Sequence, residues 1–224
     1  MYQADGASSE SREDFPCVPH PVMIPGPAGD LEAVLSCPAV ANEQVTIICH
    51  PHPLHGGTLQ NKVVHTIAKA LHESGMHTVR FNFRGVGASE GKYDDAVGEV
   101  DDLLAVVDWV ASRIPAAQIR LAGFSFGAYI ALCAEGRREV TQLVTIAPPV
   151  NLFDFTTIEQ PRCPWVLIQG EQDEIVPAQQ VLQWAGEFEH VNVVPVQDAG
   201  HFFHGRLNDL REIIMAHSVP PGSL

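Results

Sequence analysis

The chain has 224 residues, of which 46% are hydrophobic, and this length and composition predict one sizeable folded domain. Its formal net charge of −14 offers no basic surface for the phosphates of a nucleic acid, so we expect no nucleic-acid partner. No apolar run approaches the roughly 18 residues that cross a bilayer, so we expect no membrane partner either.

Residues 1–14 are polar and acidic and lack the basic and apolar regions of a secretory signal. We therefore expect a disordered N-terminal tail on a cytoplasmic protein. The folded domain is expected over residues 15–218, followed by a short C-terminal tail at residues 219–224. The five cysteines are widely spaced and include no Cys-x-x-Cys pair, which predicts idle thiols and neither a zinc site nor a redox site.

Apolar runs separated by proline and glycine follow one another in a strand and helix pattern. The first two predicted strands, Pro21–Ile24 and Leu31–Cys37, flank a turn at residues 25–30 and form an antiparallel hairpin. Predicted strands then follow at Val45–Cys49, His77–Phe83, Gln118–Phe124, Val140–Ala147, Trp165–Gln169 and Val191–Val196, and predicted helices at Asn61–Ser74, Asp94–Arg113, Ala128–Ala134, Pro177–Phe188 and Phe202–Ala216. The near-continuous apolar strands indicate an α/β fold with a mostly parallel, twisted sheet and helices on both faces. Only residues 148–164 offer material for a lid, and they are too few for more than a flap.

The pentapeptide Gly-Phe-Ser-Phe-Gly at residues 123–127 joins a predicted strand to a predicted helix, which is the context of a nucleophile elbow. A serine hydroxyl is a weak nucleophile until a base removes its proton, so the turn must present it where a base can reach it. Gly123 and Gly127 leave space for so sharp a turn. Ser125 is therefore the candidate nucleophile.

An acid and a base are expected after the nucleophile, in that order. The spacing Gly-x-x-Asp-x-x-Val-Pro places Asp173 in the loop after a strand, and we assign it as the orienting acid, with Glu171 and Glu174 as competitors. His201 follows the next strand directly after a glycine, and we assign it as the base. His204 is the alternative if the last helix starts elsewhere.

Two backbone N–H groups must also face the oxyanion that develops during the reaction. One is expected from Phe126, the residue after the nucleophile. The second is expected from the His-Pro-His-Pro-Leu-His-Gly-Gly loop at residues 50–57, where proline lacks an N–H and leaves His52, which we prefer, or Leu54.

The same loop raises a metal hypothesis, because His50, His52 and His55 lie within six residues. The intervening prolines stiffen the backbone and no cysteine or carboxylate is interspersed, so we favour a loop-supporting role and expect no metal. Residues 84–91 contain glycines but lack the third glycine of a dinucleotide fingerprint, so no cofactor is expected. We expect Arg84 to pair with an acidic residue such as Asp101 or Asp102.

These motifs resemble the α/β-hydrolase superfamily over about Val22 to Ala216. The loop at residues 50–57 and the Phe-Asn-Phe-Arg-Gly-Val-Gly segment at residues 81–87 are similar to a small, lidless bacterial subgroup of predicted hydrolases. The resemblance implies the α/β-hydrolase fold without a substantial lid and an ester-cleaving serine enzyme. Dienelactone-hydrolase-like enzymes, which are of similar size, have cysteine where this chain has Ser125. The His-Pro-His-Pro run is similar to the His-Gly-x-Pro oxyanion motif, with Pro51 in place of glycine, and this favours His52.

We therefore expect a serine hydrolase that cleaves small carboxylic esters through an acyl-enzyme. Phe124 and Phe202 are the candidate substrate wall, together with Phe126 and Phe203. Thioester, lactone or amide hydrolysis by the same groups stays open, as does a non-catalytic binding or scaffold role, although intact serine, acid and base argue against the latter. The sequence leaves the physiological substrate and the oligomeric state open.

Overall fold

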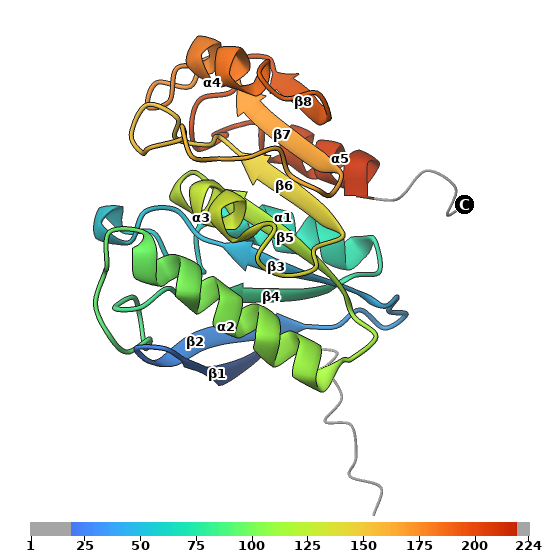
Figure 1. Ribbon diagram of the computed structural model, residues 1–224. Coiled ribbons are helices and arrows are strands. Elements are labelled where there is room, and N and C mark those ends of the chain that lie inside the picture. The colour runs from blue at the N-terminus through green and yellow to red at the C-terminus, as the bar shows by residue number, and fades with distance from the viewer. Residues whose placement is uncertain (1–18, 219–224) are drawn as a thin grey trace, which may run out of the picture.

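The computed structural model describes residues 19–218, which form one eight-stranded mixed sheet with helices against both faces (Figure 1). The strands are β1 His20–Gly26, β2 Gly29–Ser36, β3 Gln44–Cys49, β4 His77–Phe81, β5 Gln118–Phe124, β6 Gln142–Ile146, β7 Trp165–Gly170 and β8 Val191–Val196. The helices are α1 Lys62–Glu73, α2 Val97–Arg113, α3 Phe126–Ala134, α4 Ala178–Ala185 and α5 Leu207–Ser218, with a short 3-10 helix at Pro53–His55. The tails expected at residues 1–14 and 219–224 lie outside the described residues. Within residues 19–218, no helix has the length and apolar character needed to cross a bilayer.

The sheet has the strand order β1-β2-β4-β3-β5-β6-β7-β8. The antiparallel hairpin β1–β2 turns through two residues between Gly26 and Gly29, and β2 also pairs antiparallel with β4. From β4 to β8 all neighbouring strands are parallel. The predicted N-terminal hairpin and mostly parallel sheet are confirmed.

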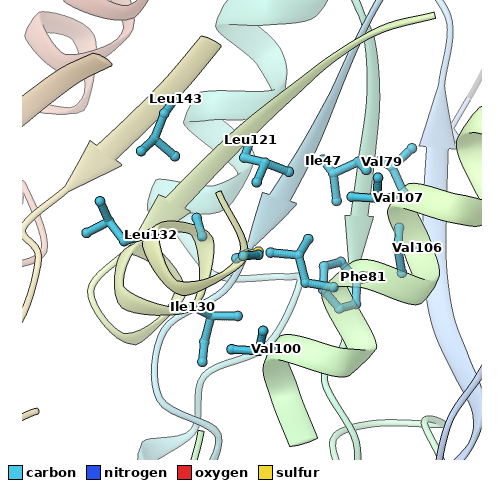
Figure 2. Close-up of a cluster of buried hydrophobic side chains, with 14 of the residues drawn as sticks. Ile47, Val79, Phe81, Val100, Val106, Val107, Leu121, Ile130, Leu132 and Leu143 are labelled. Atoms are coloured by element: carbon cyan, nitrogen blue, oxygen red, sulfur yellow. The ribbon is translucent and has the colours of Figure 1, made fainter. Parts of the chain in front are cut away.

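Two apolar clusters hold the helices on the sheet. Helices α2, α3 and α4 pack on one face, whereas α1 and α5 pack on the other, so α2 and α3 lie in front of the sheet in Figure 1. Figure 2 shows part of the first cluster, to which β3, β4, β5, β6, α2 and α3 contribute Ile47, Val79, Phe81, Val100, Val106, Val107, Leu121, Ile130, Leu132 and Leu143. Burial of each such side chain stabilises the fold by roughly 1.5–3 kcal/mol. The packed cluster therefore fixes the strand ends that carry the loops.

Three helices begin two or more residues away from the predicted start. Helix α5 begins at Leu207 instead of residue 202, because Phe203 and Gly205 have φ of 53° and 74° and the chain first makes successive turns. Helix α2 begins at Val97 instead of residue 94, after two residues with positive φ. Helix α3 starts two residues earlier than predicted, at Phe126, directly after Ser125.

The loops that follow β3, β5, β7 and β8 come together at the carboxyl edge of the parallel strands. Residues 50–57 follow β3, Ser125 follows β5, Asp173 follows β7 and His201 follows β8. In open α/β sheets, ligands bind at this edge. The fold therefore gathers the candidate site residues from segments that are distant in sequence.

Candidate active site

Ser125 lies on a strained turn between β5 and α3. Its φ of 54° and ψ of −119° are uncommon for a residue with a side chain. A Cβ on Gly123 would lie 2.2 Å from the carbonyl oxygen of Gly127, and a Cβ on Gly127 would lie 2.3 Å from the carbonyl oxygen of Cys49. Only glycine fits at either position, so the turn has the geometry that the pentapeptide predicts.

His201 connects Ser125 to Asp173 through two hydrogen bonds. Its Nε2 lies 3.1 Å from Ser125 Oγ, and its Nδ1 lies 2.8 Å from Asp173 Oδ2. Ser125 is 8% exposed and His201 is 2% exposed, so bulk water competes little for these contacts. The structure therefore brings together the three side chains that the sequence proposes as nucleophile, base and acid.

The Asp173 carboxylate accepts several hydrogen bonds. Its Oδ1 accepts from the backbone N–H groups of Ile175 at 2.9 Å and Val176 at 2.7 Å, and its Oδ2 accepts from Gln169 Nε2 at 3.1 Å. Burial raises the pKa of the Asp173 carboxyl, but the hydrogen bonds from His201, Val176 and Ile175 outweigh burial and bring this pKa below its ordinary value. The carboxylate thus stays charged and orients the imidazole.

The competing residues have other positions. Glu174 Oε2 accepts the backbone N–H of His201 at 3.1 Å and does not contact the imidazole nitrogens. Glu171 is exposed, and His204 is an exposed residue whose ring packs beside Phe202. Asp173 and His201 are therefore the pair that the geometry selects.

His50 anchors the loop at residues 50–57 to the sheet. Its side chain is fully buried, its Nδ1 donates to the Pro51 carbonyl at 2.6 Å, and its Nε2 accepts the backbone N–H of Phe83 at 3.1 Å. Burial lowers the pKa of His50 to about 4, against the opposing effect of the bond to Pro51. Both ring nitrogens of this neutral histidine are occupied, which matches the expected loop-supporting role and leaves neither of them for a metal.

The His52 imidazole organises the tip of the same loop. Its Nδ1 accepts the backbone N–H of Leu54 at 3.2 Å, and its Nε2 lies 3.4 Å from the hydroxyl of Tyr93. The Leu54 N–H is thereby occupied. Within residues 19–218, no acceptor is found for the backbone N–H of His52 or of Phe126, and their rings lie 5.0 Å apart. This arrangement favours His52 over Leu54 as the second donor.

Arg84 lies in the turn that follows β4 and holds this turn in place. Its Nε and Nη2 bond the buried carboxylate of Asp102, at 2.8 Å for the Nη2–Oδ1 pair. Its Nη1 lies 3.5 Å from Asp94. The ion pair expected with Asp102 is confirmed, and the contacts of Arg84 are architectural.

A cavity of about 570 Å³ opens beside Ser125 and His201. Its other lining residues are Pro51, His52, His55, Gly56, Gly57, Asn61, Phe126, Pro149, Leu152, Phe153, Ile175 and Phe202. The predicted wall residues Phe126 and Phe202 therefore line the cavity. Phe124 does not, which corrects its assignment: it is fully buried in the cluster beneath α1 and α5 and supports the His201 ring at a centroid distance of 5.1 Å. Phe203 is also fully buried.

Sequence reasoning missed the wall formed by Leu152, Phe153 and Ile175. Phe153 packs on Phe126 at 5.5 Å and stacks on Tyr129 at 4.9 Å. Only their position in the chain could have indicated these residues. Residues 148–164 follow β6 and Ile175 follows β7, so both segments leave the carboxyl edge of the sheet. No local pattern marks them otherwise.

Comparison with known proteins extends these observations. Residues 29–162 match the model of the X-Pro dipeptidyl-peptidase (S15) family. An α/β serine hydrolase homologue from Coxiella burnetii is 48% identical, with a TM-score of 0.87 over 89% of this chain and 97% of its own. The chain belongs to the α/β serine hydrolases. Its S15 family match spans the loop at residues 50–57 and the elbow, and ends before Asp173 and His201.

Two further relatives place this hydrolase among the small lidless bacterial members. A serine hydrolase without a lid from Xanthomonas campestris is 41% identical, with a TM-score of 0.86 over 90% of this chain and 94% of its own. An uncharacterised protein from Rickettsia prowazekii is 36% identical over 204 residues, which cover 86% of each chain. The predicted family resemblance and fold class are confirmed.

Proposed function

We propose that this hydrolase cleaves small carboxylic esters through an acyl-enzyme. The observation that carries the proposal is the hydrogen-bonded chain Ser125–His201–Asp173 at the wall of a cavity. His201 Nε2 takes the hydroxyl proton while Ser125 Oγ attacks the ester carbonyl carbon, and Asp173 stabilises the resulting imidazolium. The carbon–oxygen bond of the ester then breaks, and His201 returns the proton to the leaving alkoxide. A water molecule releases the acid by the same steps.

The oxyanion is stabilised by the backbone N–H groups of Phe126 and His52. The first N–H opens helix α3, whose N-terminal end carries partial positive charge. The second lies in the loop that His50 anchors and the His52 imidazole shapes. Loss of one such donor typically costs about 10²- to 10³-fold in kcat. A rigid loop keeps the His52 N–H in position and so supports catalysis.

The cavity lining supports a compact, uncharged substrate. Phe126, Leu152, Phe153, Ile175 and Phe202 give it an apolar surface. Its polar lining residues include His52, His55 and Asn61, and no aspartate or glutamate among residues 19–218 lines it. A neutral ester suits this lining better than a charged substrate, so we favour esters over the peptides suggested by the family name. Thioesters and lactones remain within the same proposal because they present the same kind of acyl carbon to Ser125.

The test is hydrolysis of p-nitrophenyl esters from acetate to decanoate, combined with labelling by a fluorophosphonate probe. Ser125→Ala should lose at least about 10³-fold in kcat and all labelling, because it removes the nucleophile. Ser112→Ala is the matched control, since Ser112 lies on the exposed surface of α2 and only bonds the carbonyl of Trp109. Labelling retained in folded Ser125→Ala, or a wild-type protein that is folded but neither labelled nor active, would contradict the proposal.

A further inference from the structure

A second hollow, of about 250 Å³, lies between α1 and the β2–β4 pair, away from the cavity beside Ser125. Its polar lining residues are Ser36, His65, Lys69, His72, Thr78 and Arg80. The three from α1 follow the spacing i, i+4 and i+7, so they form one stripe along the helix. Ser36 and Thr78 are paired across β2 and β4. The hollow is thus built from three packed elements.

Arg80 forms the floor of this hollow and is only 7% exposed. Its Nη1 donates to the Leu59 carbonyl at 3.0 Å and lies 2.6 Å from His65 Nε2, which also lies 2.7 Å from Gln60 Oε1. Because a guanidinium only donates, the bond to Arg80 requires this nitrogen to accept. The Nε–H and both Nη2 protons find no acceptor within residues 19–218. Burial lowers the pKa of Arg80, and burial and the Arg80 charge lower the pKa of His65. A largely buried cation therefore retains three free donors.

Within residues 19–218, the lining of the hollow around Arg80 contains a positive group, Lys69, and no negative one. No aspartate or glutamate among residues 19–218 lines the hollow, although acidic residues outnumber lysine and arginine by 27 to 13 in the chain. Glu32, on the same strand as Ser36, instead bonds Asn82 and the Ala88 N–H. Lys69 is exposed at the rim. Buried charges are ordinarily paired, so the missing counter-charge is what a ligand would supply.

The geometry points to a binding site for a phosphate group at Arg80. The free Nε–H and Nη2 donors of the Arg80 guanidinium fit two oxygens of an oxyanion. Lys69 adds a mobile ammonium at the rim. The Ser36 hydroxyl, which lies 3.0 Å from His72 Nδ1, and the Thr78 hydroxyl add neutral donors. A phosphate group offers more acceptor oxygens to these donors than a carboxylate does. The hollow lies below the roughly 300–1,000 Å³ of pockets for larger ligands, so the ligand is inorganic phosphate or a small phosphomonoester.

The test is isothermal titration calorimetry of the full chain with inorganic phosphate, methyl phosphate and acetate in a chloride buffer of constant ionic strength. We expect saturable binding of one phosphate with a Kd of about 1 mM or tighter. The double variant Lys69→Gln, His72→Gln should weaken it at least about tenfold, because it removes donors from the rim without touching the bond of Arg80 to Leu59. Lys62→Gln is the matched control, since Lys62 is an exposed lysine of the same helix that does not line the hollow.

Equal weakening by Lys62→Gln, absence of saturation in the wild type, or acetate binding as tight as phosphate would overturn the site. Binding that is tighter for phosphate than for methyl phosphate would support the free ion as ligand, and the reverse would support a phosphomonoester. Arg80→Gln should also abolish binding. Because Arg80 also holds the chain at Leu59, the rim variants carry the test if this variant fails to fold.

Discussion

The burial of His50 predicts a specific pH dependence of stability. The unfolded chain should titrate this imidazole near its ordinary pKa of about 6.5, whereas burial lowers the folded-state pKa to about 4. Between these values the unfolded state binds a proton that the folded state does not. The contribution of His50 to stability is therefore complete above about pH 6.5 and is lost as pH falls toward 4. With about 1.36 kcal/mol for each pKa unit, the loss amounts to about 3 kcal/mol.

Urea denaturation of the wild type and of His50→Gln over this range measures that contribution. Glutamine does not titrate, and other titrating groups such as Asp173 are common to both proteins and cancel in the difference. The stability advantage of the wild type should therefore shrink by about 3 kcal/mol between about pH 7.5 and pH 4. His190→Gln should leave the pH dependence of stability close to that of the wild type, because His190 is exposed. Parallel pH profiles for the wild type and His50→Gln would refute the reasoning, since they would mean that His50 is not buried as a neutral imidazole.

Three substitutions test other parts of the site. Asp173→Asn should lower kcat for an ester by about 10³- to 10⁴-fold with little change in KM, because the imidazole loses its orienting charge; steady-state kinetics measures this. Phe153→Ala should shift the optimum of the p-nitrophenyl series toward longer acyl chains, because Phe153 separates the active-site cavity from a neighbouring hollow of about 470 Å³. Phe202→Ala, which widens the cavity without reaching that hollow, should not. Gly127→Ala should lower the thermal midpoint far more than Gly136→Ala, because the Cβ at Gly127 would lie 2.3 Å from a backbone oxygen, whereas the Cβ at Gly136 meets nothing within 4 Å and bears only the strain of a φ of 81°; similar shifts would contradict this steric account.

Much of the fold follows from local pattern, because buried strands have a strong apolar signature. Strands β5 and β8 have the bounds that the sequence predicts, Gln118–Phe124 and Val191–Val196. The start of α5 could not be predicted, since Phe203 adopts a positive φ that its residue type does not favour and tertiary packing buries its ring completely. Helix boundaries of this kind depend on contacts that no local pattern records.

The two phenylalanines beside Ser125 show why the Ser125–His201–Asp173 arrangement is easier to predict from sequence than the lining of the cavity. Phe124 is the last residue of β5 and packs in the cluster beneath α1 and α5, whereas Phe126 belongs to the cluster beneath α2, α3 and α4. The turn at Ser125 sends the chain to the other face of the sheet, so similar neighbours have different surroundings. Motif spacing identifies the serine, but only the path of the chain decides which ring reaches the cavity.

In the proposed mechanism, chemistry and substrate choice thus depend on different parts of the chain. Ser125 and Phe126 are held by a glycine-flanked turn in which no Cβ fits at Gly123 or Gly127, and His50 ties the loop at residues 50–57 to Phe83, just after β4. The opposite wall comes from residues 148–164, whose Phe153 is held mainly by ring contacts with Phe126 and Tyr129. Ring contacts tolerate replacement by rings and aliphatic groups of other shapes, whereas the turn tolerates almost none. Substrate range in this hydrolase should therefore change by substitution within residues 148–164 while the turn and the His201–Asp173 pair stay intact.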